Sequence, residues 1–218
     1  MSPQDKPQTE VAVLAGGCFW GVEEILCAVP GVIDTDVGYT GGRLENPTYE
    51  DTHNGESGHA EAIRVTFDPS VLSYEDLLER WFFRLHDPTT RDRQGNDVGT
   101  QYRSAIFPQT REQRTTAERV KARVEASGRW KRPITTTIEP ASTWYSAEAY
   151  HQDYLRKHPG GIHLSLLARR EQRDSAMTHG NSTALRGATM WWNSPPLTDP
   201  ACGERSSWST SAHAGDGL

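Results

Sequence analysis

Apolar residues recur along the chain at two spacings, which predict strands and helices. Residues 11–17 form a short apolar run closed by two glycines, as expected for a buried strand. Residues 60–67 alternate instead, and Glu61 falls on the same strand face as Ile63 and Val65. A second strand is therefore predicted, with one carboxylate directed into an apolar layer.

Three segments show helical signals. Ser73 precedes residues 74–85, whose apolar side chains repeat every three or four positions and predict a core-facing helix. Thr110 opens a longer and more polar helix, and residues 146–157 predict a third. Strands and helices alternate without internal repeats, so we expect an α+β fold built as a two-layer sandwich.

The ends of the chain have a different character. Residues 1–10 are polar and contain two prolines, which predicts a flexible N-terminus. Residues 162–218 show no sustained period and are rich in Ser, Thr, Gly and Pro, so we expect this tail to be mostly disordered. One folded domain is expected between them, over residues 11–161.

Charge and cysteine content narrow the class of protein. The 218 residues carry a net charge of −6 and no cluster of Lys and Arg, which argues against nucleic acid and anionic membranes as partners. We expect neither a signal segment nor a membrane-spanning helix, because the N-terminus is polar and no apolar run is long enough. Cys18, Cys27 and Cys202 form a sparse, odd set, which favours a reducing compartment. We expect a monomeric cytoplasmic protein.

Cys18 stands where the first strand gives way to a helix, in "VLAGGCFWGVEEIL". In the first turn of a helix, unpaired N–H groups and the helix dipole favour an anion, which lowers the pKa of a thiol and makes it nucleophilic. A small buried hydrophobe is the alternative interpretation. Phe19 and Trp20 follow directly and point about 100° apart on a helix, so we expect one of them to line a pocket.

Glu61 is the natural partner for such a thiol. On an apolar strand face, desolvation raises the pKa of a carboxyl group and keeps it protonated, so that it acts as a proton donor. The alternative is a strand-end glutamate that remains in solvent. Cys18 and Glu61 together suggest a reaction in which sulfur attacks a centre while an oxygen is protonated.

Five motifs then make the chain recognisable. "GGCFWGVEE", "GYTGG", "NPTYEDTHNGESGHAEAIRVTFDPS", "HDPTTRDRQGNDVGTQYRSAIF" and "HQDYLRKHPGG" resemble peptide methionine sulfoxide reductases of the A type, in order and at family-like spacing over residues 11–161. The resemblance implies a ferredoxin-like two-layer core. It also implies reduction of the S epimer of methionine sulfoxide, free or in proteins, without a bound cofactor or metal.

The same resemblance implies roles for single residues. Cys18 of "GCFWG" is the attacking thiolate, Phe19 and Trp20 form the apolar pocket for the substrate methyl group, and Glu61 of "GHAE" protonates the sulfoxide oxygen. Methionine leaves and Cys18 becomes a sulfenic acid. A second thiol then forms a disulfide with Cys18, which thioredoxin or small thiols reduce.

Three further positions are assigned by resemblance alone. Tyr49 of "NPTY" and Tyr102 of "GTQYRS" are expected to donate hydrogen bonds to the sulfoxide oxygen. Asp97 of "QGND" is expected to contact the substrate backbone or to order a water molecule. Nothing in the hydrophobic pattern singles out these three residues.

Two other functions remain open at this point. One alternative depends on four polar residues, which could be metal ligands or could supply a base beside Cys18: His53, His59, His86 and Asp87. A base beside Cys18 would make the chain a cysteine hydrolase or acyl transferase. The histidines lack the tight spacing of metal ligands.

A binding module is the non-enzymatic alternative. It would act through the tail, whose aromatic residues are Trp191, Trp192 and Trp208. An unselected extension of the chain is the simpler explanation of these residues.

The chain departs from the family where a recycling cysteine is expected. Many members read "GGYTCHF" after the proline of "HPGG", whereas this chain reads "HPGGIHLSLLARR". Cys27 is a poor substitute, because nine helical residues span roughly 13.5 Å and bridged Cα atoms lie within ~7 Å. Cys202 on the tail is the remaining candidate for a resolving thiol.

A frameshift would account for the missing cysteine and for the patternless tail. If "IHLSLLAR" is encoded AUA-CAC-CUG-UCA-CUU-CUU-GCG-CGN, removing the first nucleotide gives UAC-ACC-UGU-CAC-UUC-UUG-CGC, which reads Tyr-Thr-Cys-His-Phe-Leu-Arg. A natural variant with one cysteine in the site is the alternative hypothesis. We predict that sequencing the gene finds AUA at Ile162 and the shifted reading behind it; any other Ile162 codon contradicts the frameshift.

Overall fold

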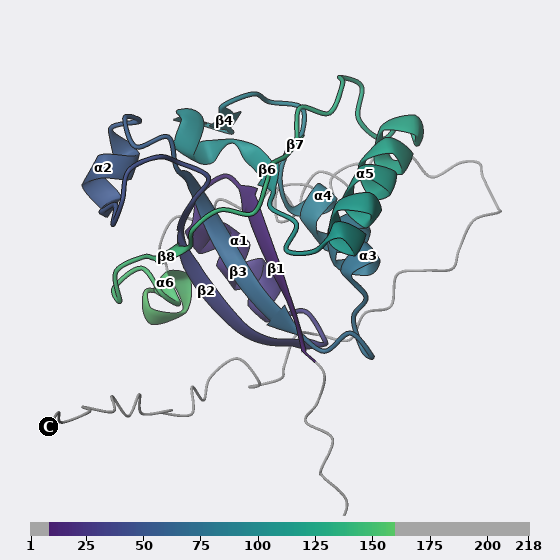
Figure 1. The fold of residues 1–218 in the computed structure, drawn as a ribbon, viewed down its shortest axis with the longest axis horizontal. Helices are drawn as coiled ribbons and strands as arrows, with labels where there is room; N and C mark the ends of the chain where they lie inside the picture. Colours follow the sequence, from purple (N-terminus) through teal and green to yellow (C-terminus); the bar gives the residue numbers. More distant parts are fainter. Residues whose placement is uncertain (1–8, 160–218) are drawn as a thin grey trace, which may run out of the picture.

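A six-stranded sheet forms the centre of the computed structural model, which describes residues 9–159 (Figure 1). The strand order is β7-β6-β1-β3-β2-β8, and only β6 and β7 run parallel to each other. The strands are β1 (Glu10–Gly16), β2 (Val32–Thr40), β3 (Ala60–Phe67), β6 (Ser104–Ile106), β7 (Thr137–Ile138) and β8 (Tyr145–Ser146).

Helices and one small hairpin complete the fold. The helices are α1 (Phe19–Cys27), α2 (Tyr49–His53), α3 (Tyr74–Asp76), the π-helical η1 (Leu77–Phe82), α4 (Phe83–Leu85), the 3-10 helix η2 (Thr100–Tyr102), α5 (Arg111–Ala126) and α6 (Tyr154–Lys157). A separate hairpin pairs β4 (Arg93–Gln94) with β5 (Asp97–Val98). The mixed sheet with helices confirms the expected α+β class.

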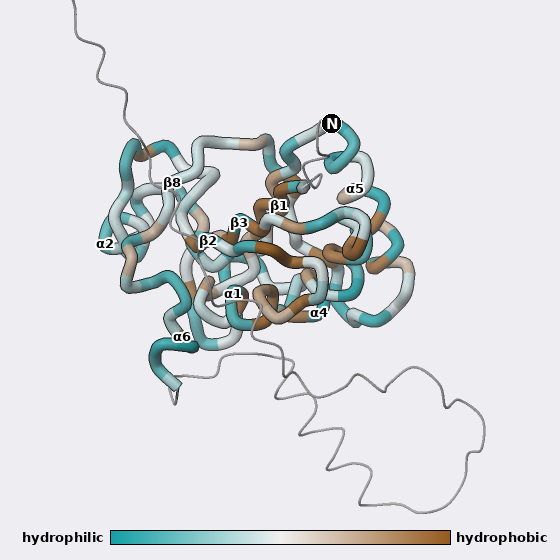
Figure 2. Tube along the Cα trace, turned by 90° about the horizontal axis from the view of Figure 1, so that it is seen from below, coloured by the Kyte–Doolittle hydropathy of each residue, from teal (hydrophilic) through white to brown (hydrophobic). Residues whose placement is uncertain are grey.

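The sheet buries both of its faces, but unequally. On one face, Leu14, Ile63 and Val65 pack with α1 residues such as Leu26 in the main core. The other face carries a small cluster of mostly short side chains around Ala62. Figure 2 shows the hydrophobic residues gathered along β1 and β3 in the interior, whereas α2 and α6 are largely hydrophilic. Burial of the central strands is therefore the main source of stability.

Local signals placed two of the three expected helices correctly. The Ser73 side chain accepts a hydrogen bond from the Asp76 N–H at the start of α3, which continues through η1 into α4. Thr110 caps α5 in the same way, through the N–H of Gln113. Both are N-cap bonds, which depend on neighbouring residues and so can be read from the sequence.

The third expected helix is wrong over most of its length. Of residues 146–157, only the last four are helical, from Tyr154 onward, because Asp153 adopts a left-handed backbone conformation at φ 55°. The side-chain amide of Gln152 instead bonds the N–H and the C=O of Val37, both at 2.9 Å. Hydrogen bonds to β2 thus replace those that a helix would make within itself.

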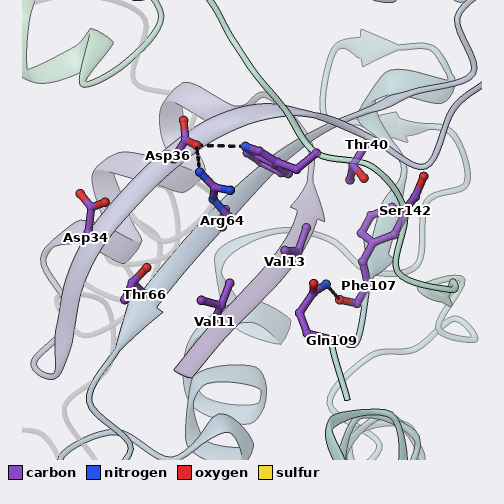
Figure 3. A pocket seen from close by; sticks show the side chains of 11 residues that line it. Val11, Val13, Asp34, Asp36, Thr40, Arg64, Thr66, Phe107, Gln109 and Ser142 are labelled. Atoms are coloured by element: carbon purple, nitrogen blue, oxygen red, sulfur yellow. Dashed lines mark hydrogen bonds and ion pairs between the residues drawn. The ribbon is translucent and has the colours of Figure 1, made fainter. Parts of the chain in front are cut away.

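A surface concavity lies on the sheet face opposite α1 (Figure 3). Its floor includes Val11, Val13 and Phe107, and one wall holds Arg64, which pairs with Asp36 at 2.6 Å. Its lining includes neither the four residues expected to act on the sulfoxide, Cys18, Glu61, Tyr49 and Tyr102, nor Asp97, which is expected to contact the substrate backbone or to order water.

Several expectations fall outside the described residues. They concern the tail over residues 162–218, its tryptophans and Cys202, and most of residues 1–10. No helix within residues 9–159 is both long and apolar enough to cross a membrane.

Candidate active site

Cys18 occupies the junction between β1 and α1. It is the N-cap of α1, with φ −53° and ψ 119°, so it lies one residue before the helix rather than within the first turn. Gly17 precedes it at φ +96°, and a Cβ atom there would come within 2.6 Å of the Gln94 side chain. Glycine is therefore required to turn the chain so tightly beneath the hairpin of β4 and β5.

Glu61 meets this junction from the neighbouring strand. It is the second residue of β3, is 2% exposed, and accepts a hydrogen bond from the Phe19 N–H through Oε2 at 3.1 Å. Burial raises the pKa of its carboxyl group to about 8, against the opposing effect of the Phe19 hydrogen bond. Such a raised pKa favours the protonated carboxyl group near neutral pH, as the strand pattern predicts, and the burial of Glu61 excludes a strand end in solvent.

The expected lowering of the Cys18 pKa is wrong. Burial raises the pKa of the thiol to about 12, and the negative charges of Glu61 and Asp97 raise it further. The N–H groups of Trp20 and Gly21 do lower it, as the helix terminus suggested, but they are outweighed. In the substrate-free site the thiol therefore keeps its proton.

Two phenols and a carboxylate surround the thiol and Glu61. Burial raises the pKa values of Tyr49 in α2 and Tyr102 in η2, and the charges of Glu61, Cys18 and Asp97 raise both further. Asp97 itself, in β5, has a pKa raised by burial. Five groups from separate parts of the chain, four of them in β3, α2, η2 and β5, thus lie within electrostatic reach of one another, and both phenols can donate hydrogen bonds.

The two aromatic residues after Cys18 have different environments. Phe19 is only 1% exposed, and its ring packs near Tyr39 and His151, with centroids 5.9 and 5.2 Å away. Trp20 is partly exposed and stacks on Tyr154 at 3.8 Å. Trp20 therefore keeps part of its surface exposed, whereas Phe19 is buried in the core.

Sequence reasoning gave no role to His151. Its Nδ1 atom accepts a hydrogen bond from Trp20 Nε1 at 3.0 Å, and its ring centroid lies 4.7 Å from that of Tyr49. Because Nδ1 accepts, the neutral ring carries its proton on Nε2. The residue belongs to the "HQDYLRKHPGG" motif, which was the one available signal.

The histidines do not form a base for Cys18. Both ring nitrogens of the buried His86 are engaged, Nδ1 with the Phe82 carbonyl at 2.9 Å and Nε2 with Ser104 Oγ at 2.7 Å. Burial lowers the pKa of His86 to about 4. His59 is held similarly, by the Gly42 N–H and the Leu44 carbonyl.

The remaining candidates of the hydrolase hypothesis have partners other than Cys18. His53 is exposed and stacks on Tyr49 at 5.2 Å, and Asp87 pairs with Arg132 at 3.0 Å. In the part of the chain that the structure describes, no three His, Cys, Asp or Glu side chains are arranged to hold a metal ion. The arrangement does not support a Cys-His-Asp triad.

We predict that Cys18 reacts slowly with iodoacetamide at neutral pH in the absence of substrate. A Cys27→Ser/Cys202→Ser variant would restrict alkylation to Cys18, and its rate should keep rising up to at least about pH 9 because only the thiolate reacts. A plateau that begins near neutral pH would contradict the raised pKa. The same variant unfolded in denaturant supplies the control for an ordinary thiol.

Comparison with known proteins agrees with this geometry. The family model described as "Peptide methionine sulfoxide reductase" matches residues 10–182. Peptide methionine sulfoxide reductase MsrA of Methanothermobacter thermautotrophicus is 57% identical over 150 residues, which cover 69% of this chain and 88% of the relative. MsrA 1 of Mesorhizobium japonicum is 54% identical over 153 residues, covering 70% and 86%.

Solved structures are similar in fold as well. Mxr1 from Saccharomyces cerevisiae in reduced form superimposes with a TM-score of 0.68 at 34% identity, covering 73% of this chain and 91% of that one. Methionine sulfoxide reductase A of Corynebacterium diphtheriae gives a TM-score of 0.62 at 37% identity, covering 74% and 80%. The chain therefore belongs to the A-type peptide methionine sulfoxide reductases.

Proposed function

We propose that this protein repairs oxidative damage by reducing the S epimer of methionine sulfoxide, free and in proteins, to methionine. The observation that carries the proposal is that the carboxyl group of Glu61 lies next to Cys18 and is protonated near neutral pH. The N–H of Phe19, the residue after Cys18, holds this carboxyl group by a hydrogen bond of 3.1 Å to Oε2. A thiol can reduce a sulfoxide only if the oxygen is protonated, because an oxide ion is a very poor leaving group.

The chemical step balances with these two residues. Hydrogen bonding from Glu61 polarises the sulfoxide, and the positive charge that develops on the substrate sulfur favours the thiolate of Cys18 beside it. The Cys18 sulfur attacks the substrate sulfur while Glu61 gives its proton to the oxygen. The substrate sulfur–oxygen bond then breaks and the oxygen, with its proton, transfers to the Cys18 sulfur. The transient sulfur–sulfur bond breaks as well, and its electron pair leaves with methionine, so that the sulfoxide is reduced by two electrons and Cys18 is oxidised to a sulfenic acid. The thiol proton replaces the proton that Glu61 gave.

The neighbouring side chains fit supporting roles. Tyr49 and Tyr102 donate hydrogen bonds to the sulfoxide oxygen, which their raised pKa values permit. Trp20 receives the substrate methyl group, and the buried Phe19 supports that surface. Asp97 binds the substrate backbone or orders water.

Regeneration needs an external reductant rather than a bound cofactor. A thiol attacks the Cys18 sulfenic acid, a disulfide forms with loss of water, and a second thiol reduces the disulfide. Thioredoxin is the reductant expected from the family, although the chain has no cysteine just after "HPGG". Cys27 ends α1, at the opposite end of the helix from Cys18. Small thiols therefore suit this sequence better than thioredoxin.

Domain organisation and location complete the proposal. The strand order β6-β1-β3-β2, with antiparallel neighbours, supports a ferredoxin-like core. The catalytic domain spans residues 11–161, although the family match continues to residue 182. We place the enzyme in the cytoplasm as a monomer, and the sparse cysteines support a reducing compartment.

Replacing either reactive group tests the chemistry. Cys18→Ser should abolish reduction of methionine S-sulfoxide with dithiothreitol, because a hydroxyl is far less acidic and less nucleophilic than a thiol.

Glu61→Gln should slow sulfenic acid formation roughly 10²- to 10⁴-fold, because the amide lacks a transferable proton. Single-turnover release of methionine measures both. An unchanged rate constant in Glu61→Gln would exclude the proton-donor role.

Recycling is expected to depend on the reductant. The protein as written should turn over with dithiothreitol but poorly with thioredoxin, and the Cys18 sulfenic acid should accumulate in a form that dimedone traps. Steady-state rates with each reductant, and mass spectrometry of the dimedone adduct, measure this. Efficient turnover with thioredoxin that disappears in Cys202→Ser would show instead that Cys202 is the resolving thiol.

A further inference from the structure

Glu148 joins three parts of the site through one carboxylate. Its Oε1 atom accepts a hydrogen bond from the Tyr49 N–H at 3.0 Å, and its Oε2 atom accepts one from the Tyr39 hydroxyl at 3.0 Å. Oε2 also lies 3.9 Å from Nε2 of His151, the residue that holds the Trp20 indole. A single side chain thus links β2, α2 and the ring that orients Trp20.

The bond to Tyr49 fixes the start of α2. Tyr49 is the first residue of this five-residue helix, and its N–H has no acceptor within the helix. Thr48 and Asp51 form a capping box with each other, so the Tyr49 N–H is left to Glu148. The position of the Tyr49 Cα atom, and hence of its phenol, is set by a residue 99 positions away in the sequence.

Glu148 is itself held firmly. The Ala147 N–H bonds the Val37 carbonyl at 2.8 Å, and the Gln152 side chain bonds Val37 again. On the far side, the Asp153 N–H donates to the buried Glu23 of α1 at 2.7 Å. The segment that carries Glu148 is therefore anchored to both β2 and α1, as a positioning element must be.

The charge of Glu148 suits this role. Burial opposes its ionisation, but hydrogen bonds from the Tyr49 N–H, its own N–H and the Tyr39 hydroxyl bring its pKa below the ordinary value. An ionised carboxylate forms stronger hydrogen bonds than a neutral acceptor. Removing the carboxylate would leave the hydroxyl of Tyr39 without this partner, at a cost in free energy because Tyr39 is fully buried and water does not reach it.

We infer that Glu148 is a positioning residue that holds Tyr49 in place to bind the sulfoxide oxygen. The inference rests on the role of Tyr49 under the proposed function. It predicts that Glu148 matters for catalysis only when the Tyr49 hydroxyl is present. A residue needed simply for folding would matter equally in both backgrounds.

A double-mutant cycle tests this coupling. Wild type, Glu148→Ala, Tyr49→Phe and the double variant would be compared by the single-turnover rate constant of methionine release and by KM. Glu148→Ala should slow the step roughly 10- to 100-fold in the wild-type background, because a small displacement of a catalytic group has effects of this size. In the Tyr49→Phe background, Glu148→Ala should lower the same rate constant by less than about 3-fold.

Two controls separate positioning from loss of structure. Glu148→Gln should recover most of the rate, because its amide oxygen still accepts the Tyr49 N–H while its NH₂ group donates to the Tyr39 oxygen. Glu75→Ala removes a carboxylate of similar exposure, 36% against 34% for Glu148, and should leave the rate unchanged. Glu75 belongs to α3, which lies on the other side of the molecule from β8 and α6 (Figure 1).

The outcomes are distinguishable. Equal losses from Glu148→Ala in both backgrounds would overturn the positioning role while leaving the proposed function intact. An unchanged rate in Tyr49→Phe would overturn the role of Tyr49 and the inference with it. If Glu148→Ala does not fold, the cycle is run with Glu148→Met, which keeps most of the side-chain volume but removes both carboxylate oxygens; equal losses in the two backgrounds would likewise overturn the inference.

Discussion

The hydrogen bond between the Glu61 carboxyl group and the Phe19 N–H, made away from water, is the interaction on which the site depends. It brings the second residue of β3 to the start of α1, and so sets the acid beside Cys18. Burial at the same point raises the pKa of Glu61 to about 8, which keeps a transferable proton at neutral pH. One contact therefore provides both the geometry and the protonation state.

Desolvation also raises the pKa of Cys18, the proposed nucleophile, which here works against reactivity. A thiolate is charged, so the environment that makes Glu61 a good acid holds Cys18 as a thiol, with its pKa near 12. Under the proposed function, the thiol keeps its proton until a polarised sulfoxide enters the site.

The segment over residues 146–157 gives this pair its surroundings. It supplies His151, which holds Trp20, and Glu148, which holds the start of α2. Over residues 147–153 its backbone follows neither a helix nor a strand, because hydrogen bonds to Val37 and Glu23 determine its path. The path of an irregular segment can thus be fixed by hydrogen bonds to distant parts of the chain.

The sequence by itself determined the features that depend on near neighbours. Strand alternation placed Glu61 in the apolar layer, the N-cap of Thr110 marked a helix, and the glycines before Cys18 marked the sharp turn. The tertiary structure alone decided the thiol pKa and the path of residues 146–157. Both follow from contacts between distant parts of the chain, such as the hydrogen bond from Trp20 to His151, which lies 131 positions away. Local periodicity carries no information about such contacts, and they determine desolvation as well as hydrogen bonding.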